Sequence, residues 1–183
     1  MLIIQTTEDL MSTQTLINID IFQMKQGAPK GEVEMNHLTD GGRPMKCIEV
    51  HGANVELLDV SVNQILKFVN KGEKFFWDFL WLEGTGRNIL ELENRIKNSQ
   101  RGLLINWDGL LNILDEITTI NEFLLIGDYS KNNLRRYETD EEMRRACSYS
   151  IELVDSSYWL ISSNVDYDFI DNLKNSFKGI SSR

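Results

Sequence analysis

Apolar residues recur along this chain with two different periods. A period of two, in which apolar and polar residues alternate, is typical of a strand with one buried face. This alternation, or a short apolar run between turn signals, predicts strands over residues 16–24, 45–50, 55–60, 122–127, 149–154 and 158–162. The segment 75–82 suits a strand or a helix, because aromatic residues favour a strand but its length allows either.

Other segments follow the 3.6-residue period of an amphipathic helix. Two of them begin with a capping box, in which Ser61 precedes Gln64 and Thr139 precedes Glu142 by three residues. Either Asn164 or Asp166 is expected to cap the last helix. The predicted helices run over about 61–72, 87–97, 108–117, 139–147 and 166–177.

Strands and helices are mixed without a strict strand–helix repeat, so the expected fold class is α+β. We expect a mixed or antiparallel sheet flanked by several helices in a single domain. Asp155, Ser156 and Ser157 are predicted to form the turn of a hairpin. The first 15 residues are expected to be flexible, and the domain to span 16–183 with a loop-rich arm at 26–44.

The distribution of charge indicates a binding surface. The chain has a formal net charge of −9 over 183 residues. Residues 102–128 contain five acidic residues without a Lys or Arg, and residues 146–173 contain five more, again without a base. A folded acidic protein of this kind is suited to a basic partner. The same charge opposes phosphate contacts, so direct binding to nucleic acid is not expected.

Several other classes of protein are not indicated by the sequence. There is no secretory signal and no apolar run near 20 residues, so we expect a cytoplasmic protein that does not cross a membrane. Cys47 and Cys147 lack the spacing of zinc ligands and are predicted to be buried, reduced thiols. We therefore expect no metal ion and no cofactor.

Catalytic motifs are weak, and no catalytic residue is assigned. Cys47 and His51 are the one nucleophile–base pair close in sequence, but on a strand they would lie about 13 Å apart. The Gly-Thr-Gly segment at 84–86 precedes a helix but lacks the further glycine of a dinucleotide-binding loop. An enzyme or ligand-binding domain would need a site assembled from distant residues, such as a pocket with a carboxylate of perturbed pKa.

Eight residues are the candidates for contact with a protein partner. Asp115 and Glu116 stand near a helix C-terminus, where the helix dipole disfavours carboxylates, so local stability does not account for them. Asp166 and Asp168 begin the last helix, where capping is the plainer explanation for both. Two aromatic residues could serve as interface anchors. The candidates are Trp107, Asp108, Asp115, Glu116, Asp155, Tyr158, Asp166 and Asp168.

The C-terminal part of the chain resembles a known group of proteins. Residues 123–177 read FLLIGDYS and, further on, RRYETDEEMRRACSYSIELVDSSYWLISSNVDYDFIDNLKNSF. This order of strand, capped helix, Cys, hairpin and helix resembles small bacterial proteins, among them the immunity proteins encoded beside polymorphic toxins. The resemblance covers about a third of the chain. It implies an acidic protein that inhibits a cognate toxin by binding it.

Three functions follow from these observations. The first is a non-enzymatic immunity-type inhibitor, whose carboxylates would occlude the basic active-site cleft of a toxin. The second is a ligand-binding domain or enzyme with a site assembled from distant residues. The third is a self-associating structural protein, in which the arm at 26–44 would reach a neighbouring subunit.

Overall fold

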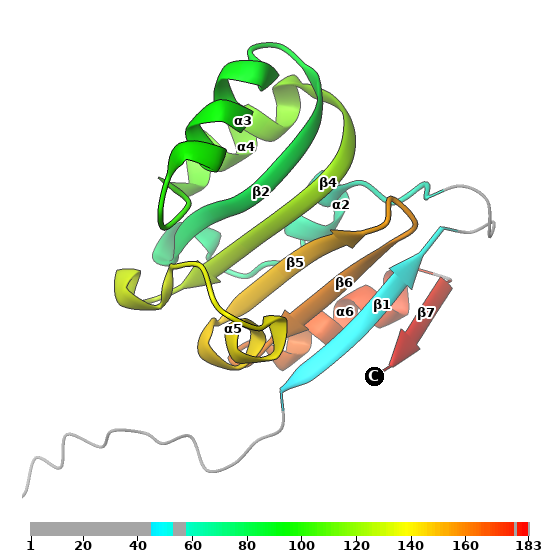
Figure 1. Ribbon diagram of the computed structural model, residues 1–183. Helices are drawn as coiled ribbons and strands as arrows, with labels where there is room; N and C mark the ends of the chain where they lie inside the picture. Colours follow the sequence, from blue (N-terminus) through cyan, green and yellow to red (C-terminus); the bar gives the residue numbers. More distant parts are fainter. Residues whose placement is uncertain (1–44, 53–57, 178, 183) are drawn as a thin grey trace, which may run out of the picture. The chain divides into compact units, whose positions relative to one another are not determined.

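Figure 1 shows a computed structural model of the chain. The structure describes residues 45–52, 58–177 and 179–182. These residues all fall within one compact unit, Arg43–Arg183. The flexible N-terminus, the strand at 16–24 and the loop-rich arm at 26–44 that the sequence predicts lie outside the described residues.

A seven-stranded antiparallel sheet runs through this unit, with the order β3-β2-β4-β5-β6-β1-β7 (Figure 1). The predicted α+β class is therefore confirmed, and the sheet is antiparallel rather than mixed. Its strands are β1 (Lys46–His51), β2 (Phe76–Gly86), β3 (Leu103–Ile105), β4 (Ile117–Asp128), β5 (Tyr149–Val154), β6 (Tyr158–Ser163) and β7 (Gly179–Ser182).

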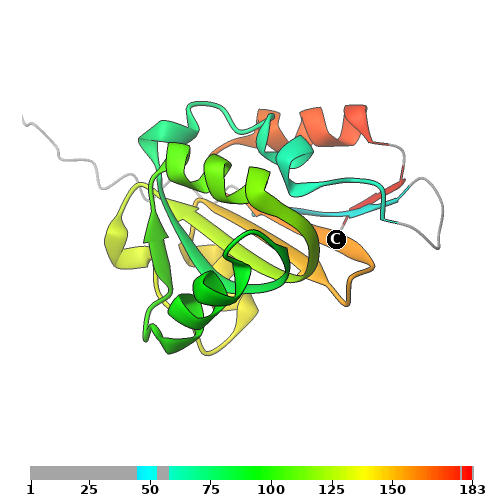
Figure 2. The same cartoon turned by 90° about the horizontal axis from the view of Figure 1, so that it is seen from above.

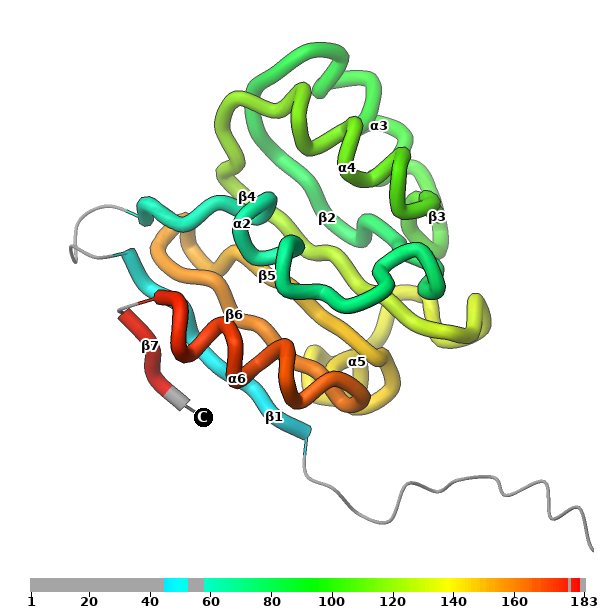
Figure 3. Tube along the Cα trace, turned by 180° about the vertical axis from the view of Figure 1, so that it is seen from behind, coloured from blue at the N-terminus to red at the C-terminus, as the bar shows by residue number. Residues whose placement is uncertain are grey.

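Helices accompany the sheet on both faces. Three of them, α2, α4 and α6, lie side by side over one face, and α5 lies on the other (Figures 2 and 3). Helix α3 packs along β2. The helices are α2 (Val62–Leu66), α3 (Ile89–Asn98), α4 (Trp107–Glu116), α5 (Asp140–Ala146) and α6 (Tyr167–Ser176), with short 3-10 helices at Gly72–Lys74 and Lys131–Asn133.

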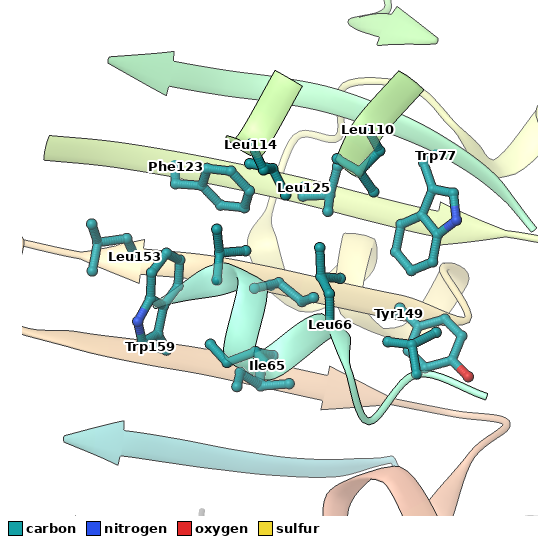
Figure 4. Close-up of a cluster of buried hydrophobic side chains, with 14 of the residues drawn as sticks. Ile65, Leu66, Trp77, Leu110, Leu114, Phe123, Leu125, Tyr149, Leu153 and Trp159 are labelled. Atoms are coloured by element: carbon teal, nitrogen blue, oxygen red, sulfur yellow. The ribbon is translucent and has the colours of Figure 1, made fainter. Parts of the chain in front are cut away.

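We call the sheet face under α2, α4 and α6 the inner face and the opposite face the outer face. The main apolar core joins side chains of the strands to those of α2, α4 and α6 on the inner face, and it also includes Ile89, Leu92 and Ile96 of α3. Figure 4 shows part of this core, with side chains of α2 and α4 against those of the strands. A smaller cluster on the outer face joins the sheet to α5 and the loop before it. This cluster consists of Leu80, Ile126, Leu134, Met143 and Cys147.

Of the ambiguous segment 75–82, residues 76–82 belong to strand β2. Trp77 and Phe79 belong to the inner core, whereas Leu80 belongs to the outer cluster. A register shift between Phe79 and Trp81 then pairs Trp81 with Leu124 of β4. Beyond this bulge the side chains still alternate between the two faces. Each of them points to the face opposite to the one that the alternation before the bulge would give.

Tertiary contacts explain two differences from the predicted elements. The capping box of Ser61 is present, but α2 ends at Leu66 instead of about 72. The chain turns before Gly72, where a Cβ would lie 2.6 Å from the ring of Trp107, so only glycine fits beneath this ring. Residues 58–60 form no strand, and the carbonyl of Val60 instead accepts a hydrogen bond of 2.7 Å from the Trp159 indole.

Of the two predicted caps for the last helix, Asp166 is the one used. Asn164 has a different role, because its side-chain amide donates to the carbonyls of Arg144, Arg145 and Cys147 at distances of 2.8–2.9 Å. These are carbonyls at the end of α5, which have no partner within the helix. Asn164 therefore connects the end of α5 to the loop between β6 and α6.

We expect Asn164→Ala to lower the free energy of unfolding by about 1–3 kcal/mol, because three carbonyls lose their donor. Urea denaturation of both proteins would measure the change. Asn175→Ala is a matched control, since Asn175 is exposed on α6 and should change stability by no more than about 0.5 kcal/mol. Equal effects of the two substitutions would show that Asn164 does not stabilise α5.

Candidate functional site

Helix α4 carries four of the eight predicted contact residues. Asn106 caps it by accepting a hydrogen bond of 2.8 Å from the Gly109 amide. Its buried residues pack on the inner core, so Asp108, Asp115 and Glu116 are exposed. Among the described residues, none of these three carboxylates lies within ion-pair distance of a base.

Trp107 is mainly a packing residue. Its ring lies 5.3 Å from the ring of Trp77, which is fully buried. It also covers Gly72, as described above. Only part of the indole therefore remains available for a partner.

Asp155 and Tyr158 lie at the hairpin between β5 and β6. The structure confirms this predicted hairpin. Asp155 and Ser156 both have positive φ, a conformation that Asp tolerates well. Tyr158 and Trp159 point to opposite faces, as expected for a strand, and Trp159 is the buried one. The ring of Tyr158 lies 5.0 Å from the ring of His51 on β1.

Asp166 has structural partners for both carboxylate oxygens. Oδ1 accepts from the Phe169 amide at 2.9 Å, and Oδ2 accepts from the Tyr149 hydroxyl at 3.0 Å. The capping explanation is thus confirmed for Asp166. Asp168 lies in the first turn of α6, where the helix dipole favours its charge, and it is exposed.

The predicted contact residues lie at two opposite ends of the sheet. The N-termini of α4 and α6 share one end, because Trp77 contacts both Trp107 and Tyr149, and Tyr149 bonds to Asp166. The hairpin with Asp155 lies at the other end, as does the C-terminus of α4 with Asp115 and Glu116. The eight residues therefore do not form one continuous surface.

The residues considered for catalysis do not form a catalytic site. His51 Nε2 lies 3.1 Å from Glu49 Oε2, and neither His51 nor Cys47 lines the two pockets described below. Gly84 is part of β2, where a Cβ would lie 2.2 Å from the Thr119 carbonyl oxygen, so its role is close packing of two strands. Cys47 and Cys147 are both buried, as predicted, and the structure records them as thiols and not as a disulfide.

A pocket of about 360 Å³ lies on the outer face of β2, β4 and β5. Three acidic residues line it, Glu122, Glu152 and Asp155. Trp81 is another lining residue, and it is 41% exposed although it is a large aromatic residue. Its indole N–H donates to the Glu122 carboxylate, which fixes the orientation of the ring. We call this the acidic pocket.

Two arginines near the acidic pocket already bond to other groups of the chain. Arg136 lines the pocket, but its guanidinium donates to the carbonyls of Leu80, Ile96 and Ser99 at 2.9–3.3 Å. Arg144 forms an ion pair of 2.9 Å with Glu152. Glu122 and Asp155 have no ion-pair partner among the described residues, so the rim of the pocket keeps a negative charge.

A second pocket, of about 480 Å³, lies near the other end of β2 and has Asp78 in its lining. Asp78 is only 2% exposed, and its Oδ1 has no hydrogen-bond partner among the described residues. Burial raises the pKa of Asp78 to about 7, although Arg136 and Arg101 act in the opposite direction. We call this the Asp78 pocket.

Asp128 is the other buried carboxylate of the outer face, and it is fully bonded. It accepts two hydrogen bonds from Ser148, one from the Ser130 amide and one from Asn133, all at 2.8–3.0 Å. Nearby, burial raises the pKa of the Cys147 thiol to about 11, so this thiol is not an activated nucleophile. Asp78 thus differs from Asp128 because its Oδ1 has no hydrogen-bond partner among the described residues.

Of the residues that line these two pockets, only Asp155 is among the eight contact residues predicted from the sequence. Trp81 and Glu122 are far apart in the chain and meet because β2 pairs with β4. One signal for Asp78 is present in the sequence, since it is the only charged residue in the otherwise apolar segment 75–82. A lone carboxylate in such a segment predicts a buried acid.

We compared the chain with protein-family models, with curated proteins and with solved structures, and none of the three comparisons returned a match. In the part of the chain that the structure describes, no helix is long and apolar enough to cross a bilayer. Across the same residues, no three His, Cys, Asp or Glu side chains are grouped so that they could hold a metal ion.

Proposed function

We propose that this chain is a non-enzymatic binding protein that engages a basic protein through the acidic pocket. The observation that carries the proposal is the exposed ring of Trp81 beside the unpaired carboxylates of Glu122 and Asp155. A Lys or Arg side chain of a partner would find an aromatic face and two negative charges in the same hollow. Exposed tryptophans at such places are frequent anchors of protein interfaces.

The wider charge distribution supports the same function. The chain carries a net charge of −9, and the acid-only segments 102–128 and 146–173 supply Glu122 and Asp155. Long-range attraction would steer a basic partner toward this surface and make association depend on salt. An immunity-type inhibitor acts in this way, with carboxylates taking the positions of substrate phosphates in the cleft of a toxin. The proposed setting is the cytoplasm, with a cognate toxin as the partner.

The test is to capture the basic partner at low salt, purify it and measure binding kinetics with variants of the acidic pocket. We expect Trp81→Ala to raise the Kd about thirtyfold or more, mainly through faster dissociation. The double variant Glu122→Gln, Asp155→Asn should slow association and flatten its dependence on salt.

A matched control is the double variant Asp115→Asn, Glu116→Gln, which removes the same charge from the end of α4. It should leave the Kd within about threefold of the original, because only weak long-range attraction is lost. If this control reduced binding and the pocket variants did not, the partner surface would be α4 instead. Recovery of the chain with copies of itself alone would favour the self-associating alternative.

The control variant also tests why Asp115 and Glu116 are present. Both carboxylates oppose the dipole at the end of α4, so neutralising them should stabilise the fold by about 0.3–1 kcal/mol. In the original chain the Asn63 side chain donates to Asp115 at 3.1 Å. An Asn at position 115 would still offer Asn63 an acceptor. A loss of stability in urea denaturation would show that the fold needs these charges, for example through the hydrogen bond from Asn63 to Asp115, and would remove the argument for α4 as a binding surface.

A further inference from the structure

We propose that the Asp78 pocket is a binding site for the oxyanion group of a small molecule, a carboxylate or a tetrahedral phosphate or sulfate, with Asp78 as a protonated donor. The site is separate from the acidic pocket. It would make the chain a ligand-binding protein in addition to any protein partner that it has.

The lining of the Asp78 pocket fits such a ligand. Asp78 contributes a buried carboxyl group, and Arg101 and Lys131 contribute positive charge. Leu104 and Leu134 add apolar surface for the carbon atoms of a small organic molecule. A volume of about 480 Å³ is within the range of small-molecule sites.

The unpartnered oxygen of Asp78 is the observation that points to a ligand. Buried polar atoms are nearly always hydrogen-bonded, and one without a partner costs stability. Gly102 lies beside this oxygen, because a Cβ at position 102 would be 2.3 Å from Asp78 Oδ1. The chain thus brings backbone close to the carboxyl group without supplying a hydrogen bond to it.

Charge decides which kind of ligand fits. A cationic ligand would be opposed by the basic residues of the lining, whereas an oxyanion would be attracted by them. Arg101 has one guanidinium nitrogen bonded to the Lys131 carbonyl at 3.1 Å, which leaves other N–H donors. An oxyanion would accept from these donors and also from the hydroxyl of a protonated Asp78.

Protonation of Asp78 is consistent with its surroundings. Burial raises its pKa to about 7, so the neutral form is accessible near neutral pH. The charged and titratable groups near it come from the loop before β3, from β4 and from the segment 131–147: they are Arg101, Asp128, Lys131, Arg136 and Cys147. An oxyanion would bind with uptake of a proton by Asp78, so affinity should fall as pH rises above 7.

The experiment is an NMR titration of the full chain with sodium sulfate and, separately, with sodium acetate, at pH 6 and pH 8 and constant ionic strength. Sulfate stays fully ionised over this range, and acetate stays almost fully ionised. We expect saturable shifts of the Gly102 and Arg101 amides with at least one anion, and a Kd about tenfold higher at pH 8, because a group of pKa about 7 is mostly deprotonated there. Sulfate would identify a tetrahedral ligand, and acetate a carboxylate.

Two variants and a control variant make the result specific. Asp78→Asn keeps a donor at every pH, so it should bind with the same Kd at pH 6 and pH 8. Arg101→Gln should raise the Kd about fivefold or more at both pH values, whereas Arg95→Gln, an exposed arginine on α3 outside this pocket, should not. Thermal unfolding would verify that each variant is folded.

Absence of saturable shifts with both anions would overturn the proposal. So would a Kd that is the same at pH 6 and pH 8 in the original chain, or an equal effect of the two arginine substitutions. These outcomes concern only the Asp78 pocket. They are distinguishable from a failure of the acidic pocket, which is measured with Trp81, Glu122 and Asp155 variants.

Discussion

Replacing Asp78 with Asn should raise the free energy of unfolding by about 3–4 kcal/mol at pH 8 and leave it nearly unchanged at pH 4. Burial raises the pKa of Asp78 from 3.8 to about 7 in the folded chain. The folded state therefore holds this proton more tightly than the unfolded state, and the original protein loses stability as pH rises from about 4 to 7. One pKa unit corresponds to about 1.4 kcal/mol, and Asn carries no charge to bury.

The same substitution at Asp128 should have the opposite sign. Asp128 accepts four hydrogen bonds, and an Asn side chain would place its N–H groups against donors from Ser130, Asn133 or Ser148. We expect Asp128→Asn to lower the free energy of unfolding by about 2–3 kcal/mol at pH 8. Urea denaturation at pH 4 and pH 8 would measure both variants. A destabilising effect of Asp78→Asn at pH 8, or an equal gain at both pH values, would contradict the account given for Asp78.

Replacing Gly127 with Ala should lower the free energy of unfolding by about 2–3 kcal/mol. A Cβ at this position would lie 2.6 Å from the ring of Trp77 on the neighbouring strand. The ring is fully buried, and its indole N–H donates to the Gly72 carbonyl at 2.9 Å, so it has no room to move aside. Overfilling a packed core in this way typically costs a few kcal/mol.

A double-mutant cycle would isolate this clash. Trp77→Leu alone should cost about 3 kcal/mol by leaving a cavity, and Gly127→Ala should then cost almost nothing, because the methyl group enters space that the ring occupied. The control is Gly127→Ala combined with Trp159→Leu, since Trp159 is a buried tryptophan elsewhere in the core. That pair should be additive. Additivity in the Trp77 pair would show that the ring does not limit position 127.

The sequence predicted best those helices and strands whose signals come from residues close together in the chain. Helices α3, α4, α5 and α6 and the hairpin of β5 and β6 follow from periodicity, caps and turn residues, which act within a few positions. The end of α2 and the segment 58–60 were predicted wrongly. There the conformation depends on Trp107 and Trp159, which are distant in sequence and close in the fold.

The two pockets were less accessible to sequence reasoning for the same reason. The acidic pocket depends on the register of β2 against β4, including the bulge that moves Trp81 to the outer face. A hydrophobic pattern does not reveal a bulge of this kind, because the alternation on either side of it looks normal. The acid-only segments contain Glu122 and Asp155, but the sequence does not show where those side chains meet.

The position of β1 in the sheet has a consequence for how the chain folds. β1 comes first among the described strands, yet it lies between β6 and β7, which come last. During synthesis on a ribosome, β1 emerges early and must wait for the C-terminal strands before it can pair. The strands β2, β4, β5 and β6 can assemble in chain order, so insertion of β1 is the step with the longest loop to close and is expected to limit the folding rate.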